Sequence, residues 1–312
     1  MTGAPERPLV DFVVVGAQRS ATTYLNACLG GHPQIFMCRD EVPFFEHPFF
    51  ESSPPSALRA AFAGAFDGQR LGIQRPDYLA RPECAGNVRL LAPEARILAV
   101  LRDPVARAIS AYHWYVQFGL LPLVPLDEGM ERLLDGWTDP EHPRASEILE
   151  LGFYGRHLHR YLEAFGPQQV LALLNDDLRD PATFQRVFRF LAVDEHHAPR
   201  TTERPANAGT YDSRRLRFLR ARRRFVWSWD DVTTYTYRPR RLRRPVASVL
   251  SAVMVGFDRV VLARVLGEGS PPPLRPDLHQ RLRATYAEDV ERLESMIGRD
   301  LRHWRDELQR SA

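Results

Sequence analysis

The sequence of 312 residues contains no lysine, so all 42 of its basic residues are arginines. This absence excludes enzymes that form a Schiff base through lysine, and phosphate-binding loops that depend on a lysine. An arginine guanidinium has a pKa above about 12, so it can hold an anion but is not a practical proton donor. Any cation at a functional site of this chain therefore acts through charge and hydrogen bonds.

Cysteines and long apolar runs are also scarce. Cys28, Cys38 and Cys84 are the three cysteines, and their spacing matches neither a metal site nor a redox motif. No run approaches the roughly 18 apolar residues that span a bilayer, and residues 1–8 lack the pattern of a secretory signal. With 44% hydrophobic and 26% charged residues, we expect a soluble, cytoplasmic globular chain.

The order of the predicted elements indicates an α/β fold. Short β-branched apolar runs predict buried strands at residues 9–15, 71–74, 96–101 and 170–174. Helical patterns with start or stop signals follow at residues 20–29, 104–118 and 181–191. Strands that alternate with helices pair in parallel, so we expect a doubly wound parallel sheet between helical layers.

Two regions do not fit the alternation, and we expect both to elaborate a single domain over residues 1–312. Residues 119–150 read as a long loop or a partly helical insertion. After the core at 9–193, residues 194–312 form an extension in which 214–244 holds twelve arginines interleaved with aromatic residues. Apolar residues at helical spacing over 278–308 predict C-terminal helices.

The first motif that carries chemistry lies between a predicted strand and a helix. Residues 16–23 read Gly-Ala-Gln-Arg-Ser-Ala-Thr-Thr. Backbone N–H groups in such a turn and the positive end of the helix dipole bind anions. Arg19 adds a fixed positive charge, and Ser20, Thr22 and Thr23 add hydroxyl donors. The ordinary alternative is a helix start that happens to be rich in hydroxyl side chains.

The second motif, residues 102–110, follows the strand at 96–101. Arg102 leaves the carboxyl end of this strand, where open α/β sheets bind ligands, and Ser110 lies two turns along the next helix. An arginine and a hydroxyl that reach one point describe a phosphate site, although Arg-Asp-Pro is also a common helix start. Together the two motifs indicate a ligand with phosphate groups on both sides of a sugar.

These two motifs resemble those of the sulfotransferases that use 3′-phosphoadenosine 5′-phosphosulfate (PAPS). Residues 16–25 look like the 5′-phosphosulfate loop of that family, and residues 101–110 look like its 3′-phosphate motif. Looser similarity to the heparan sulfate or carbohydrate branch occurs at residues 32–33, 40–45, 75–79, 153–162, 176–178 and 190–191.

The resemblance implies a P-loop-NTPase-like three-layer fold and transfer of a sulfuryl group from PAPS to an acceptor hydroxyl or amine, without a metal. Arg19 takes the place of the family's lysine near the leaving phosphate, and Glu41 matches the proposed general base. The resemblance also assigns residues to the two phosphates of the nucleotide. These residues are Gln18, Arg19, Ser20, Ala21, Thr22, Thr23, Arg102 and Ser110.

The sequence departs from the family pattern at several positions. Ala21 replaces a glycine of the phosphate loop, while Pro43 and Gln74 replace a histidine and a lysine on the acceptor side. Residues 207–214, with Arg214 among them, are a candidate for the family's basic loop near the adenine. Tyr154 is a candidate for an adenine or acceptor contact, with a packed helix aromatic as the alternative.

Several alternatives stay open from the sequence. Glu41 can form an ordinary salt bridge with its neighbour Arg39. The arginine-rich region and residues 246–257 also fit a non-catalytic protein that binds nucleic acid or lies on an anionic membrane. The ordinary alternative for this region is a solvated surface over a small extension of the core. We expect a small-molecule or carbohydrate acceptor, disfavour nucleic acid, and leave open a weak membrane contact through 214–257. The sequence predicts neither the acceptor nor the oligomeric state.

Overall fold

The computed structural model describes residues 8–199, 211–231, 236–239, 253–254, 256–257 and 272–305. The chain divides into two compact units that interleave along the sequence. The first unit holds the described parts of Met1–Asp103, Phe153–Ala206 and Ala287–Arg305, and the second holds those of Pro104–Gly152 and Asn207–Tyr286. The sequence instead predicts a single domain with a core at 9–193 and an extension at 194–312, and that division stays a prediction.

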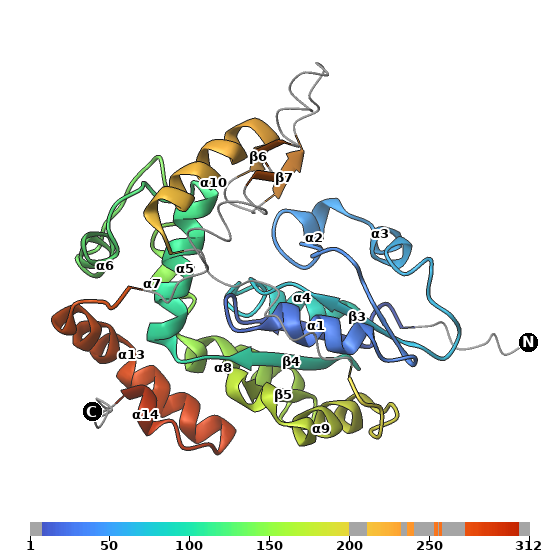
Figure 1. Ribbon diagram of the computed structural model, residues 1–312. Helices are drawn as coiled ribbons and strands as arrows, with labels where there is room; N and C mark the ends of the chain where they lie inside the picture. Colours follow the sequence, from blue (N-terminus) through green and yellow to red (C-terminus); the bar gives the residue numbers. More distant parts are fainter. Residues whose placement is uncertain are drawn as a thin grey trace, which may run out of the picture. The chain divides into compact units, whose positions relative to one another are not determined.

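The first unit is built on a five-stranded parallel sheet (Figure 1). Its strands, in spatial order, are β2 (Ile35–Met37), β3 (Arg70–Gln74), β1 (Phe12–Gly16), β4 (Arg96–Leu101) and β5 (Val170–Leu174). The predicted parallel α/β sheet is therefore confirmed. Strand β2 was not predicted, because three residues are too few to show a periodic pattern.

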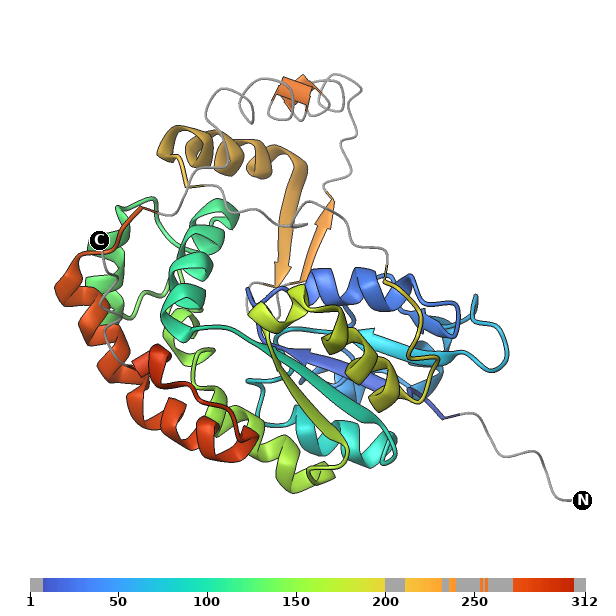
Figure 2. The same ribbon diagram turned by 60° about the horizontal axis from the view of Figure 1, so that its bottom comes forward.

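Helices cover both faces of this sheet, as Figure 2 shows. On one face, α1 (Thr22–Gly30) and α9 (Pro181–Leu191) pack on Phe12 and Val14 of β1 and on Leu98 and Val100 of β4. On the other face lie α4 (Cys84–Leu91) and α8 (Tyr154–Phe165). All five residues of β1 are buried, which explains its uninterrupted apolar sequence.

Two helices begin at the prolines that the sequence predicts: α5 (Pro104–Phe118) and α9. At the start of α9, the carboxylate of Asp180 accepts a hydrogen bond of 2.9 Å from the backbone N–H of Ala182. This is the N-cap and proline arrangement that favours a helix start. The remaining short helices of the first unit are α2 (Phe49–Ser52), α3 (Pro55–Ala60), η1 (Asn175–Arg179) and α14 (Arg302–Arg305).

The described part of the second unit is mainly helical. It contains α5 (Pro104–Phe118), α6 (Leu126–Leu134), α7 (Glu147–Glu150), α10 (Ser213–Val226) and part of α13 (Pro276–Ile297), which continues into the first unit. The insertion at 119–150 is thus partly helical, as expected. Strands β6 (Trp227–Asp231) and β7 (Thr236–Pro239) pair antiparallel and were not predicted, although their alternating aromatic residues are typical of strands.

Residues 246–257, for which a membrane contact was one alternative, lie outside the described residues except at 253–254 and 256–257. No helix in the described ranges combines the length and hydropathy that a membrane span requires.

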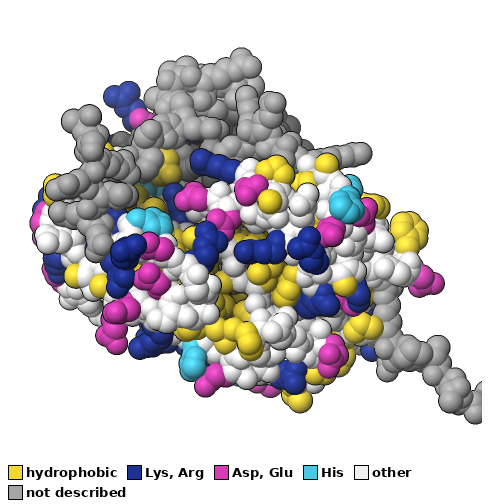
Figure 3. Space-filling view, turned by 90° about the horizontal axis from the view of Figure 1, so that it is seen from below, with side chains coloured by type: hydrophobic (Ala, Val, Ile, Leu, Met, Phe, Trp, Pro, Cys, Tyr) yellow, Lys and Arg dark blue, Asp and Glu magenta, His cyan; other side chains and the backbone are white. Residues whose placement is uncertain are grey.

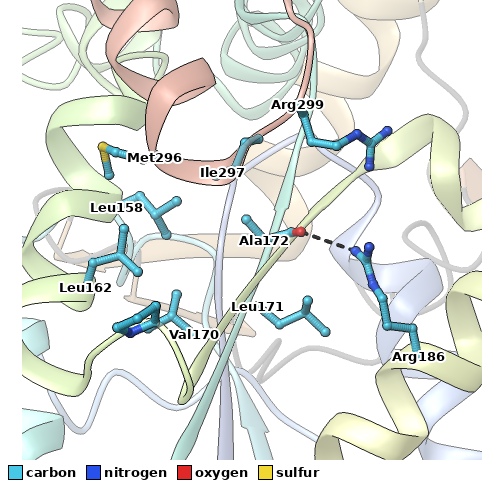
Figure 4. A pocket seen from close by; sticks show the side chains of 10 residues that line it. Leu158, Leu162, Val170, Leu171, Ala172, Arg186, Met296, Ile297 and Arg299 are labelled. Atoms are coloured by element: carbon cyan, nitrogen blue, oxygen red, sulfur yellow. Dashed lines mark hydrogen bonds between the residues drawn. The ribbon is translucent and has the colours of Figure 1, made fainter.

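The surface carries two features apart from the predicted motifs. The first is a face on which hydrophobic side chains are bordered by arginines (Figure 3). A pocket of about 240 Å³ also lies beside the free edge of β5, where the side chain of Arg186 donates a hydrogen bond of 3.5 Å to the carbonyl of Ala172 (Figure 4). None of the residues that line it belongs to the site predicted from the sequence.

Candidate active site

The turn between β1 and α1 is held by backbone hydrogen bonds. The N–H of Ala17 donates to the carbonyl of Val100 at 2.7 Å, and the N–H of Ser20 donates to the carbonyl of Ala17 at 3.2 Å. Arg19 and Ala21 adopt left-handed backbone conformations with φ of 67° and 70°. Glycine adopts such conformations at less cost than alanine, which matches the glycine that the related loop has at position 21.

Gly16 allows this turn to lie directly against the segment after β3. A Cβ atom at Gly16 would come within 2.8 Å of the carbonyl oxygen of Pro76 and 2.9 Å of Cβ of Leu79. Both distances are shorter than van der Waals contact, and the first involves backbone that cannot move independently. A glycine is therefore required for close packing at this position.

The turn presents several groups suited to an anion. Helix α1 begins at Thr22, and Ala21 before it supplies no side-chain cap. The backbone N–H groups at a helix N-terminus, together with the helix dipole, are suited to bind an anion. The hydroxyl of Ser20 is buried and makes no hydrogen bond within the described part of the chain. A phosphate oxygen at this turn would accept hydrogen bonds from such groups, and the partly exposed Arg19 would add charge.

Arg102 lies next to this turn. Strands β1 and β4 are parallel neighbours, so their carboxyl ends meet at the same edge of the sheet. There Nη1 of Arg102 donates a hydrogen bond of 3.4 Å to the carbonyl oxygen of Arg19. The two motifs that the sequence singled out are thus adjacent in the first unit. Ser110 lies on α5 of the second unit and is 6% exposed, and its contact with a phosphate stays a prediction.

Three carboxylates surround the buried side chain of Arg75, directly after β3. Nε and Nη2 of Arg75 donate to the two carboxylate oxygens of Glu46 at 2.7 and 3.1 Å. Nη1 of Arg75 lies 3.9 Å from Oε2 of Glu41. The third carboxylate, Asp77, accepts a hydrogen bond of 3.2 Å from the side-chain amide of Gln18. These four residues, which we call the Arg75 cluster, connect Glu41 to the phosphate loop.

The surroundings of Glu41 suit a proton acceptor. Its side chain keeps 49% of its surface exposed, yet loss of water on the protein side raises the pKa of its carboxyl group. Asp77 and Glu46 also raise this pKa, while Arg75 and a hydrogen bond with Gln74 lower it. A carboxylate with a raised pKa is a stronger base. Within the described residues, Glu41 forms an ion pair with Arg75 and not with Arg39, the partner that the sequence offered as an alternative.

The sequence motifs did not point to Arg75, Glu46 or Asp77, because the resemblance at Arg75-Pro-Asp-Tyr is loose. Position offers a signal for Arg75 and Asp77, because charged residues directly after a strand that neighbours β1 lie at the ligand-binding edge of the sheet. No such signal marks Glu46.

The structure places the two weaker candidates as follows. Tyr154 is fully buried at the start of α8, with its ring 6.4 Å from that of Trp304, so packing accounts for its position. Arg214 is exposed on α10 in the second unit, where its N–H donates to Asp212 at 2.8 Å. Of the candidate basic loop at 207–214, the structure describes residues 211–214, and residues 207–210 lie outside the described ranges. Nucleotide contacts of both residues stay predictions.

Comparison with known proteins agrees with this arrangement. The chain is 29% identical over 180 residues to the membrane-associated sulfotransferase kil1 of Dictyostelium discoideum, covering 54% of this chain and 36% of kil1. It is 25% identical over 196 residues to human heparan sulfate glucosamine 3-O-sulfotransferase 3B1, covering 62% and 48% of the two chains. The chain thus spans less than half the length of these relatives.

A crystal structure of a sulfotransferase from Alicyclobacillus acidocaldarius has the same fold. It aligns with a TM-score of 0.64 over 96% of this chain and 99% of that one, at 23% identity. The family model described as "Sulfotransferase domain" matches residues 9–203, which is more than half of the chain and includes the phosphate loop, Arg102 and the Arg75 cluster. The chain therefore belongs to the sulfotransferase family.

Proposed function

We propose that this sulfotransferase takes its sulfuryl group from PAPS and transfers it to a hydroxyl or amine of a small-molecule or carbohydrate acceptor, releasing adenosine 3′,5′-bisphosphate. The observation that carries the proposal is the contact between Arg102 and the carbonyl of Arg19. It brings two anion-binding elements together at one edge of the sheet. A nucleotide with phosphates at both its 5′ and 3′ positions fits two such elements, whereas a single phosphate needs one.

The residues of the turn match the 5′ end of this donor. The N–H groups at the start of α1 and the hydroxyl of Ser20 would hold the 5′-phosphate. Arg19 would lie near the oxygen that bridges phosphorus and sulfur, and Arg102 would hold the 3′-phosphate. These assignments draw on the geometry of the turn and on the family resemblance together.

The reaction requires one bond to form and one to break at sulfur. The acceptor oxygen or nitrogen forms a bond to sulfur as the bond from sulfur to the bridging phosphate oxygen breaks, and that oxygen keeps the electron pair. The guanidinium of Arg19 stabilises the negative charge that develops there, without donating a proton. The carboxylate of Glu41 accepts the proton that the acceptor loses.

Two considerations bear on the acceptor and on the alternative function. The human relative is named for heparan sulfate, but this chain has Pro43 and Gln74 where the resemblance implies a histidine and a lysine on the acceptor side. We therefore propose a carbohydrate or small-molecule acceptor other than heparan sulfate. A non-catalytic protein that binds nucleic acid or membranes is not favoured, since the family match includes both motifs.

A transfer assay tests the proposal. PAPS labelled with sulfur-35 is offered with panels of sugars, phenols, alcohols and amines, using the unmodified chain and the Glu41→Gln variant. We expect label on at least one class of acceptor and a loss of about 100-fold or more in kcat for the variant. The proposal is overturned if no acceptor is labelled and adenosine 3′,5′-bisphosphate does not raise the melting temperature.

A further inference from the structure

The side chain of Arg75 is fixed more firmly than an ion pair with Glu41 alone would require. It is 7% exposed, and its bidentate hydrogen bonds to Glu46, which is 2% exposed, use Nε and Nη2. A guanidinium is planar, so these two bonds also fix the direction of the third nitrogen. That nitrogen, Nη1, lies 3.9 Å from Oε2 of Glu41.

We propose that Arg75 is a positioning residue that holds the carboxylate of Glu41 where it accepts the acceptor's proton. This inference rests on the proposed function, and it adds a residue for which the resemblance assigns no role. Arg75 would not touch the reacting atoms. It acts through Glu41, by fixing the orientation of the carboxylate and by keeping it ionised until the proton arrives.

The neighbours of Glu41 explain why a fixed cation matters here. Four groups act on its ionisation: Arg75 and Gln74 favour the carboxylate, whereas Asp77 and Glu46 disfavour it. Loss of water on the protein side also favours the neutral acid. Without the charge of Arg75, Glu41 would carry a proton over more of the working pH range and would accept none from the acceptor.

The same cluster ties the base to the donor loop. Asp77 lies two residues after Arg75, and its carboxylate accepts a hydrogen bond from Gln18 of the phosphate loop. The charges of Arg75 and Asp77 attract each other. One network of buried side chains thus connects Glu41 to the loop that would hold the donor phosphate. This connection fixes the distance and orientation between the proton acceptor and the donor.

After transfer, Glu41 must lose its proton before the next cycle. Its side chain is half exposed, so water can take the proton directly, whereas the buried Glu46 stays bound to Arg75. The two glutamates of the cluster therefore have separate tasks: Glu41 exchanges protons, and Glu46 anchors the arginine.

The pH dependence of kcat/KM distinguishes positioning from a merely structural role. In Arg75→Gln the pKa of Glu41 rises, so the acid limb of the profile moves to higher pH and kcat falls about 10- to 100-fold. In Glu46→Gln a negative neighbour is lost, so the acid limb moves to lower pH while kcat still falls. Arg75→Lys keeps the charge, so it returns the acid limb toward its original pH with kcat still reduced.

Two further variants control for loss of folding and for the general effect of removing an arginine. Arg75→Gln leaves Glu46 buried without its partner, so the double variant Arg75→Gln with Glu46→Gln removes both charges and keeps the fold. Arg70→Gln is the matched control, because Arg70 pairs with Asp11 at the opposite end of β3. We expect an unchanged acid limb in the control and a reduced kcat in the double variant.

The outcomes separate this inference from the proposed function. If the unmodified chain transfers sulfate and Glu41→Gln does not, while Arg75→Gln and the double variant keep the original kcat and acid limb, the positioning role of Arg75 is wrong. If the unmodified chain neither transfers sulfate nor binds adenosine 3′,5′-bisphosphate, the proposed function is wrong. Opposite shifts of the acid limb in Arg75→Gln and Glu46→Gln support the inference.

Discussion

The side-chain amide of Gln18 donates a hydrogen bond of 3.2 Å to Oδ1 of Asp77, and both side chains are buried. This bond joins the turn after β1 to the segment after β3. The N–H of Ala17 joins the same turn to Val100 of β4 on the other side. The phosphate loop is therefore fixed to both strands that neighbour β1.

Removing the Gln18 bond should weaken the binding of nucleotide as well as the fold. We expect Gln18→Ala to lose about 1 kcal/mol of unfolding free energy and to bind adenosine 3′,5′-bisphosphate several-fold more weakly, because the buried hydrogen bond that joins the loop to Asp77 is lost. Gln169→Ala is the control: its amide bonds to the carbonyls of Pro93 and Ala95, away from the turn. It should lose stability with unchanged affinity, as measured by urea unfolding and calorimetry.

Arg102→Ala should abolish most of the response to nucleotide. Charged hydrogen bonds contribute about 1.5–3 kcal/mol, so the affinity for adenosine 3′,5′-bisphosphate should fall roughly 10- to 150-fold. Thermal shift titration with this nucleotide measures the effect. Arg292→Ala, which removes an exposed arginine that pairs with Glu288 on α13, should leave the titration unchanged. Equal affinity in both variants would contradict the assignment of Arg102.

The strained backbone at Ala21 predicts opposite effects of glycine at two positions. Ala21→Gly relieves a left-handed conformation and should stabilise the chain by about 1 kcal/mol. Ala27→Gly, in the middle of α1, should destabilise it by about the same amount, because glycine weakens helices. Melting temperatures of the two variants measure the difference. A decrease in both would show that Ala21 carries no strain.

A methyl group at Gly16 should be poorly tolerated. Gly16→Ala places its Cβ against the backbone at Pro76, so we expect a loss of about 1–3 kcal/mol and a weaker response to nucleotide. Gly86→Ala in α4 meets nothing within 4 Å, so it should stabilise the chain by up to about 1 kcal/mol. Urea unfolding of the pair decides whether close packing at Gly16 matters.

The pair of Asp177 and Arg299 should contribute stability only where Asp177 is ionised. Two hydrogen bonds from Arg299, at 2.9 and 3.0 Å, hold the pKa of Asp177 below its ordinary value of 3.8. The stabilisation is therefore present above the ordinary pKa and disappears as the pH falls through the lowered value. Because both side chains are partly exposed, Asp177→Asn should cost less than about 1 kcal/mol at neutral pH.

This difference should shrink as the pH falls below the ordinary pKa of Asp177 and should vanish once the carboxylate is protonated in the folded chain as well. Urea unfolding at neutral pH and at an acidic pH measures it. Glu288→Gln, in an exposed pair with Arg292, is the matched control and should change stability little at either pH. A cost for Asp177→Asn that stays the same at low pH would point to packing instead of charge.

The sequence allowed the central strands and the helices that follow them to be predicted, because their signals are local. Buried β-branched runs marked β1 and β4, and Pro104 and Pro181 marked the starts of α5 and α9. Strand β2 carries too few residues for such a signal. The pairing of β6 with β7 was hidden because many arginines suggested a solvated surface.

The candidate site was predicted in part for the same reason. The turn around Arg19 and the position of Arg102 follow from short motifs at strand ends. The Arg75 cluster does not, because Glu41, Glu46 and Arg75 come together only when the segment after β2 meets the segment after β3. A single sequence does not show which of several arginines a glutamate will pair with: Glu41 pairs with the distant Arg75, and not with its neighbour Arg39, which the sequence offered as an alternative.

The position of β1 in the middle of the sheet has a consequence for synthesis. Phe12 pairs with Gly72 on one side and with Arg96 on the other. The first strand therefore leaves the ribosome well before either partner exists, with apolar side chains and a free edge on both sides. The carbonyl of Val100 in β4 accepts the hydrogen bond from the N–H of Ala17 only after β4 has been synthesised, so the anion-binding turn forms later in translation than β1 itself.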